Sequence, residues 1–144
     1  MPDGKGIGPR IDVVVPTRNR AGLAVGAVRN ALQQTGVDVR VIVVVDGTED
    51  ETAHVVRDLE DDRVSVLEHE GQSGLSAARN DGIAHGDSPW IAFLDDDDRW
   101  APDKLHSQVV ALAENPSAAW VVTGCVRTDG ELRPQTTWDI AEGG

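Results

Sequence analysis

Four consecutive aspartates, Asp95–Asp98, are the residues of this sequence whose type and spacing point most directly to chemistry. They follow directly on the apolar run 90–94, which is typical of a fully buried central strand. Adjacent carboxylates repel one another, so the sequence predicts that a cation binds among them. The alternative is a solvated acidic turn that leads into a helix. The position at the end of a strand favours a ligand site, because open α/β sheets bind ligands there.

The expected cation is a hard divalent ion. Mg²⁺ or Mn²⁺ takes one or two carboxylates from a protein and completes its shell with water and phosphate oxygens. The aspartates are therefore expected to form half of a site whose other half is a nucleoside diphosphate, whose charge the ion would neutralise as it departs. In an extended segment alternate side chains point to opposite faces, so Asp95 and Asp97 are expected to point one way and Asp96 and Asp98 the other.

Alternating strands and helices are predicted to position this run. Strands are predicted at 11–15, 39–45, 63–67, 90–94 and 118–126, with helices at 22–34, about 50–60, 75–85 and 102–114. Pro16 is expected to end the first strand because it has no N–H for a central ladder. This order predicts an α/β fold with a Rossmann-like, doubly wound, mostly parallel sheet. Residues 1–10 are expected to be a disordered leader, 11–126 one domain and 127–144 an irregular tail.

The carboxyl ends of parallel strands meet at one edge of a sheet. Thr17, Asp46 and Asp95–Asp98 each follow or end a predicted strand, so they are expected to lie near one another. Arg79, on the helix before the aspartates, is a candidate anion contact, and a solvated helix arginine remains an equal alternative. No GxxxxGK[ST] or GxGxxG phosphate loop occurs in the sequence.

The composition excludes several classes of function. The 144 residues carry a formal charge of −12, which argues against a nucleic acid or an anionic membrane as the partner. A single cysteine, Cys125, excludes an internal disulfide and a cysteine-based zinc site. No apolar run approaches the length of a transmembrane segment, so a cytoplasmic protein is expected. The four histidines lack metal-ligand spacing and are expected to be surface or packing residues: His54, His69, His85 and His106.

Four segments together resemble a known family. They are VVVPTRNR at 13–20, VIVVVDGTEDET at 41–52, GLSAARNDGI at 74–83 and WIAFLDDDDRWAPDKL at 90–105. In this order they are similar to the nucleotide-sugar-binding half of a family 2 glycosyltransferase with the GT-A fold. The resemblance covers about residues 11–126. It implies a metal-dependent inverting glycosyltransferase that moves a sugar from a nucleoside-diphosphate donor, with a UDP-sugar expected, to a saccharide or other hydroxyl acceptor.

The resemblance also implies a role for each matching residue. Asp46 would hydrogen-bond a base such as uracil, and Arg79 would lie beside the base or the diphosphate. Asp97 would be the metal ligand together with Asp95, and Asp98 and Trp100 would shape the sugar and acceptor side. The residues expected to contact the nucleotide are Pro16, Thr17, Arg18, Asp46, Arg79, Asp95 and Asp96.

Two departures from the family pattern limit these expectations. Val45 replaces the first of the paired aspartates that family members commonly have before Gly47. Inverting members take their catalytic base from a later segment, and none of the later acids has the expected context: Asp129, Glu131, Asp139 and Glu142. The base is therefore expected outside this chain, and 127–144 would begin an acceptor-binding segment.

The alternative function is a truncated or non-catalytic nucleotide-sugar-binding module. It would share the donor site with the enzyme and lack the catalytic base. A phospho-receiver domain is disfavoured, because it needs an acidic pair after the first strand, where this chain has Pro16 and Thr17.

Overall fold

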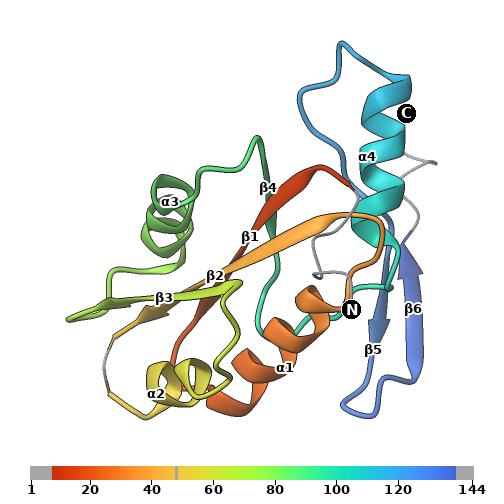
Figure 1. The fold of residues 1–144 in the computed structure, drawn as a ribbon. Helices are drawn as coiled ribbons and strands as arrows, with labels where there is room; N and C mark the ends of the chain where they lie inside the picture. Colours follow the sequence, from red (N-terminus) through yellow and green to blue (C-terminus); the bar gives the residue numbers. More distant parts are fainter. Residues whose placement is uncertain (1–7, 48, 139–144) are drawn as a thin grey trace. The chain divides into compact units, whose positions relative to one another are not determined.

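The computed structural model describes residues 8–47 and 49–138, and it confirms the predicted α/β class (Figure 1). The chain divides into two units, 1–106 and 107–144, which are treated separately below. In chain order the elements are β1 (Arg10–Thr17), α1 (Ala21–Leu32), β2 (Asp38–Asp46), α2 (Thr52–Arg57), β3 (Val64–His69), α3 (Leu75–His85), β4 (Trp90–Phe93), α4 (Lys104–Glu114), β5 (Cys125–Thr128) and β6 (Pro134–Trp138).

The first unit is built on a parallel sheet of four strands in the order β3-β2-β1-β4. Dense β-branched residues make β1 and β2 its central strands, and Val13–Val15 and Val41–Val45 are buried. In Figure 1, α1 and α2 lie on one side of the sheet and α3 on the other, which is the predicted doubly wound arrangement. Because β1 pairs with β2 on one side and β4 on the other, the strand order reverses at β1. Ligands of such sheets bind at the carboxyl ends of the strands where this reversal occurs.

The prediction that Pro16 ends the first strand is wrong. Pro16 lies inside β1 and is paired in register with Val44 of β2. The N–H of Leu94 donates to the carbonyl of Val14, so the backbone N–H and C=O groups of the even-numbered residues of β1 point toward β4. The last β1–β4 pair is Val14 with Phe93, so the missing N–H of Pro16 falls beyond the end of the β4 ladder.

The run 90–94 is also not the fully buried central strand that its composition predicts. β4 is an edge strand of this sheet, and the side chains of Ile91 and Phe93 are 37% and 46% exposed. An apolar run identifies a strand but does not determine its place in the sheet.

The second unit differs from the sequence prediction at both ends. Residues 118–124 form no regular structure, although a buried strand is predicted at 118–126, and Trp120 is 75% exposed. β5 and β6 form an antiparallel hairpin where an irregular tail is predicted. The Asp129 carboxylate accepts the N–H groups of Glu131 and Arg133, which closes the turn between the two strands. Such a side-chain-closed turn makes a hairpin from a polar stretch with little strand character.

A buried carboxylate joins β1 to the connection between α3 and β4. Asp12 is fully buried, and it accepts the N–H groups of Asp87 and Ser88 at 2.8 and 2.9 Å and the Ser88 hydroxyl at 2.6 Å. Arg40 Nε of β2 donates to it at 3.2 Å. Burial alone would raise the pKa of Asp12, but these hydrogen bonds and the Arg40 charge outweigh it and lower the pKa.

The α3–β1 contact leads to a test of the packing. Gly82 of α3 lies against Val14, and a Cβ added at Gly82 would meet Val14 Cγ1 at 2.4 Å. Gly82→Ala is therefore expected to lower the free energy of unfolding by about 1–3 kcal/mol through overpacking, despite alanine's better helix propensity. Urea unfolding measures the change. Gly22→Ala in α1 is the control, because its Cβ would enter open space and should be neutral or stabilising by up to about 1 kcal/mol. A Gly82→Ala chain as stable as the parent would contradict the close approach.

Candidate functional site

The four aspartates form a turn. The N–H of Asp98 donates to the carbonyl of Asp95 at 3.0 Å, which reverses the chain within the run. The extended backbone from which the alternation of the side chains was predicted is therefore wrong. Leu94 is buried just before the turn and anchors it beside β1 through its hydrogen bond to Val14.

Asp96 points inward and connects the turn to the loop after β1. It is 5% exposed; its Oδ2 accepts the Thr17 hydroxyl at 2.8 Å and its Oδ1 accepts Arg20 Nη1 at 3.1 Å. Thr17, itself 5% exposed, is the last residue of β1. The structure thus brings Thr17 and the aspartates together at the point where the strand order reverses.

Asp95 and Asp97 present their carboxylates nearer the surface. Asp95 Oδ1 accepts Arg79 Nη2 at 2.7 Å, and the Arg79 guanidinium lies 5.7 Å from the centre of the Phe93 ring. The Nε of Arg79 is buried and has no hydrogen-bond partner within the described part of the chain. Asp97 has a side chain that is 61% exposed, and its Oδ2 lies 3.7 Å from Arg20 Nη1. Two arginines therefore face three carboxylates.

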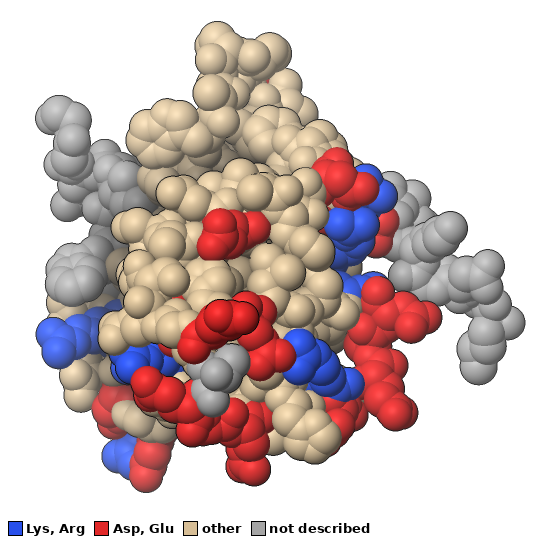
Figure 2. Space-filling view, turned by 90° about the vertical axis from the view of Figure 1, so that its left-hand side faces the viewer, with Lys and Arg blue, Asp and Glu red and all other residues tan. Residues whose placement is uncertain are grey.

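Negative charge remains in excess at this turn. Loss of hydration raises the pKa of Asp98, the nearby carboxylates of Asp97, Asp95 and Asp96 raise it further, and the charge of Arg99 opposes the rise. Figure 2 views the side toward which β2 and β3 point in Figure 1, and acidic side chains gather in its lower half with Lys and Arg among them. Arg20 was not singled out from the sequence, although an arginine in the loop after the first strand is a cation of the kind that the aspartates require.

The segment after the turn is fastened to α1 and the loop that follows it. Asn30 Nδ2 donates to the Trp100 carbonyl at 3.1 Å, and the Trp100 N–H donates to Asn30 Oδ1 at 2.8 Å. Gln34 Oε1 accepts the N–H of Leu105 at 3.0 Å. The Trp100 ring lies under the Lys104 ammonium, 4.1 Å from its centre. Asn30 thus fixes the backbone of Trp100, and the Lys104 ammonium covers one face of its ring.

Asp46 ends β2 and is 6% exposed. Its Oδ1 accepts the Ser73 N–H at 2.7 Å and lies 3.0 Å from His69 Nδ1, while Oδ2 accepts the Gly74 N–H at 2.8 Å. Burial would raise the pKa of Asp46, but these hydrogen bonds lower it. Since a carboxylate offers about four acceptor positions, one remains at Oδ2. Among the described residues, no hydrogen bond or ion pair joins Asp46 to the aspartate turn.

Arg18 connects the loops after β1 and β2. Arg18 Nη2 and Asn19 Nδ2 donate to the two oxygens of Glu49 at 3.0 and 2.8 Å, and the pKa of Glu49 is lowered by these hydrogen bonds. The Nε of Arg18 is buried and has no partner among the residues that the structure describes. It lies 3.9 Å from where a Cβ of Gly47 would be, and Gly47 has a φ of +110°. Arg18, like Arg79, therefore has an unused donor at this edge of the sheet.

No three His, Cys, Asp or Glu side chains are grouped to hold a metal ion within residues 8–47 and 49–138. Mg²⁺ and Mn²⁺ need only one or two carboxylates from a protein when phosphate oxygens and water supply the rest of their ligands. Asp95 and Asp97 have the required chemistry.

Within residues 8–47 and 49–138, no helix has the length and apolar character needed to cross a membrane.

Comparisons with known proteins identify relatives of the chain. The family model described as Glycosyl transferase family 2 matches residues 12–140. The succinoglycan biosynthesis protein ExoO of Rhizobium meliloti is 39% identical over 101 residues, which are 70% of this chain and 29% of the relative. The Escherichia coli protein WfgD, a UDP-Glc:alpha-D-GlcNAc-diphosphoundecaprenol beta-1,3-glucosyltransferase, is 29% identical over 73% of this chain and 42% of its own. The chain spans less than half the length of either relative.

Solved structures show the same fold. The mannosyltransferase PcManGT from Pyrobaculum calidifontis, in complex with GDP-Man and Mn²⁺, aligns with a TM-score of 0.67 and 26% identity over 84% of this chain and 35% of that one. Residues 1–349 of S. aureus TarS, in complex with UDP-GlcNAc, align with a TM-score of 0.66 and 23% identity over 74% of this chain and 32% of that one.

Proposed function

The chain belongs to glycosyl transferase family 2, and from this premise we propose that it binds a nucleoside-diphosphate sugar at the carboxyl ends of its parallel strands. The protein would then transfer the sugar to the hydroxyl of a saccharide or other acceptor. One observation carries the proposal: Asp96 is bound to Thr17 and Arg20, so that Asp95 and Asp97 are presented where the strand order reverses. This is the place where open α/β sheets bind ligands.

The nucleotide would lie between the loops after β1 and β2 and the start of α3. Asp46 keeps one acceptor position at Oδ2, which suits a ring N–H such as that of uracil. Arg18 and Arg79 each keep a buried Nε–H without a partner among the described residues, and a diphosphate would supply acceptors for them. Pro16 and Thr17 would form the wall of the pocket at the end of β1. UDP-sugars are the first donors to test, because the free acceptor position of Asp46 suits uracil.

Asp97, together with Asp95, would hold Mn²⁺ or Mg²⁺. When bound, such an ion neutralises the negative charge of a departing diphosphate. Arg79 would orient the diphosphate from the other side, and Asp98 and Trp100 would contact the sugar or acceptor. Support for a metal comes from the excess negative charge of the turn and from the Mn²⁺ in the PcManGT complex.

The proposed reaction is a single displacement with inversion at the anomeric carbon. The acceptor oxygen forms a bond to this carbon while the bond to the diphosphate oxygen breaks, and a base takes the hydroxyl proton. No described residue is assigned as this base. Asp129, one of the few later acids, uses its carboxylate to close the β5–β6 turn.

Calorimetric titration tests the donor site. UDP and GDP are titrated into the chain with and without Mn²⁺. UDP is expected to bind with Mn²⁺ and to bind at least about tenfold more weakly without it, because Asp95 and Asp97 would hold the ion and its charge would offset the repulsion between the aspartates and the diphosphate. If neither nucleotide binds under either condition, the proposal is wrong.

The non-catalytic binding module remains a second candidate function, since no base is assigned among the described residues. Turnover of UDP-sugars in the presence of mixed saccharide acceptors distinguishes the two. Release of UDP that depends on the acceptor favours the transferase, whereas nucleotide binding without release favours the module.

A further inference from the structure

A histidine that the proposed function does not use is fixed between two carboxylates. His69, the last residue of β3, has a side chain that is only 14% exposed. Its Nδ1 lies 3.0 Å from Asp46 Oδ1 and its Nε2 lies 2.8 Å from Asp81 Oδ2. Asp46 ends β2 and Asp81 belongs to α3, so the imidazole joins three elements.

Both ring nitrogens therefore face acceptors. A neutral imidazole has one donor and one acceptor nitrogen, so it can satisfy only one of the two carboxylates. The imidazolium has two N–H donors and satisfies both. The hydrogen bond to Asp46 raises the pKa of His69 above its ordinary value, partial burial opposes the rise, and Asp81 adds to it.

The contacts of His69 continue to the donor site through Asp46. The same Asp46 carboxylate accepts the N–H groups of Ser73 and Gly74. Gly74, with a φ of +93°, is the residue from which α3 begins. Five residues later α3 carries Arg79, whose guanidinium pairs with Asp95. The orientation of the loop 71–74 and of Arg79 thus depends on the Asp46 carboxylate.

We propose that His69 is a positioning residue of the donor site, which as an imidazolium fixes the Asp46 carboxylate and α3 so that the loop 71–74 is held in its binding conformation. The effect on the nucleotide rests on the proposed function, whereas the effect on the loop does not. Loss of the ring proton removes one of the two hydrogen bonds and sets a nitrogen lone pair against a carboxylate. Asp46 and Asp81 then share a single hydrogen bond from the ring, so α3 and the loop 71–74 are held less firmly.

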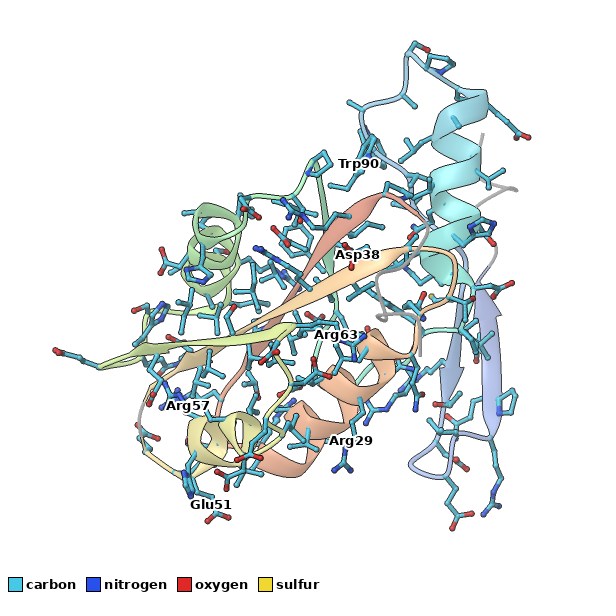
Figure 3. All side chains as sticks on the ribbon, in the orientation of Figure 1. Arg29, Asp38, Glu51, Arg57, Arg63 and Trp90 are labelled. Carbon is cyan, nitrogen blue, oxygen red and sulfur yellow. The ribbon has the colours of Figure 1, made fainter. Side chains whose placement is uncertain are left out.

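The direction of the pH dependence follows from the groups around the ring. Asp46 faces it from β2 and Asp81 from α3. On the same strand as His69, Glu68 pairs with Arg57 of α2. The Arg57 side chain lies between α2 and β3 in Figure 3. Because the pKa of folded His69 is raised, its stabilising contribution is complete below the unfolded pKa of about 6.5 and is lost as the pH rises through the folded value.

The test combines ring titration, amide exchange and nucleotide affinity in the full chain. NMR follows the His69 ring and the exchange protection of the Ser73 and Gly74 amides from pH 6 to 9.5. Calorimetry follows the Kd of UDP over the same range with Mg²⁺. The variant is His69→Gln, and the control is His54→Gln in α2, whose ring is 77% exposed and pairs only with Asp58 among the described residues.

In the parent, amide protection and UDP affinity are expected to fall by about tenfold across the titration of the His69 ring. In His69→Gln both should be reduced at pH 6 without this step, and His54→Gln should match the parent. If the parent binds UDP and its loop protection does not follow the ring titration, the inference is wrong and the proposed function stands. If the loop follows the ring and no nucleotide binds, the proposed function fails and the inference about the loop stands. A neutral His69 ring at pH 6 would also overturn the inference.

Discussion

Replacing Asp97 with asparagine is expected to weaken the binding of Mn²⁺ by about 100-fold or more, and so to remove the gain of at least about tenfold that Mn²⁺ gives to the binding of UDP. Asparagine keeps the size of the side chain and one oxygen, but it removes the negative charge that a hard divalent cation selects. Substitution of residues that only support a metal ligand costs about 10–100-fold in metal affinity, so loss of a direct ligand should cost at least as much. Calorimetric titration of UDP into the variant, with and without Mn²⁺, measures the effect.

The fold of the variant should be unaffected. The Asp97 side chain is 61% exposed and has one ion pair, at 3.7 Å to Arg20. Its urea unfolding midpoint should therefore match that of the parent, which separates loss of binding from loss of structure. Asp103→Asn is the control, since Asp103 is exposed just before α4 and its substitution should leave UDP binding unchanged. An Asp97→Asn chain that binds UDP and Mn²⁺ like the parent would remove Asp97 from the proposed metal site.

The largest effect on stability is expected for Asp12→Ala, which should lower the free energy of unfolding by about 3–5 kcal/mol. Removing the Asp12 carboxylate leaves the N–H groups of residues 87 and 88 and the Ser88 hydroxyl without their acceptor, and each unsatisfied group costs about 1–3 kcal/mol. Arg40 contributes less to the loss, because its side chain is 36% exposed and it keeps its ion pair with Asp87 at 2.8 Å. Urea unfolding at neutral pH measures the loss. Asp62→Ala, at an exposed position before β3, should stay within about 0.5 kcal/mol of the parent. A loss of less than about 1 kcal/mol in Asp12→Ala would contradict the assigned role.

Acid titration provides a second measurement for Asp12. Because its pKa is lowered in the folded chain, its contribution to stability is present above the unfolded pKa of about 3.8 and is lost as the pH falls through the lower, folded value. The parent should therefore lose stability in acid more steeply than Asp12→Ala, which has already lost this contribution. If the free energy of unfolding falls equally steeply below pH 4 in the parent and in Asp12→Ala, the acid sensitivity belongs to other carboxylates.

Local pattern was enough to predict most of the first unit. The β-branched run in β2 identified a strand, and α3 begins and ends at the residues that its sequence pattern and the following Gly86 predict. The place of each strand in the sheet was harder. Pro16 does not interrupt a ladder, because the pairing of β1 with β4 ends at Val14, before Pro16 is reached. The edge strand β4 is rich in apolar residues, so its composition resembles that of a central strand.

The site divides in the same way. Thr17, Asp46, Arg79 and the aspartates could be proposed as site residues from strand ends and a family pattern, because both depend on neighbours in the sequence. The partners within the site were not. Arg20 is 76 residues from Asp96 and His69 is 23 from Asp46, so these contacts exist only after the strands have been ordered. The turn at 95–98 was predicted only as the alternative to a ligand site, because its hydrogen bond is a backbone property that four identical side chains do not specify.

The hydrogen bond between Thr17 and Asp96 has a consequence for how the chain folds. It joins two residues that are 79 positions apart in the sequence. In contrast, β1 pairs with β2 and β2 with β3, so each of these pairs joins strands that follow one another in the chain. Contacts between distant residues close large loops and form late in simple folding reactions. The proposed donor site would therefore be incomplete in an intermediate made of β1, β2 and β3 alone. Nucleotide binding would report completed folding, and a bound nucleotide would slow unfolding by fastening β4 to the sheet.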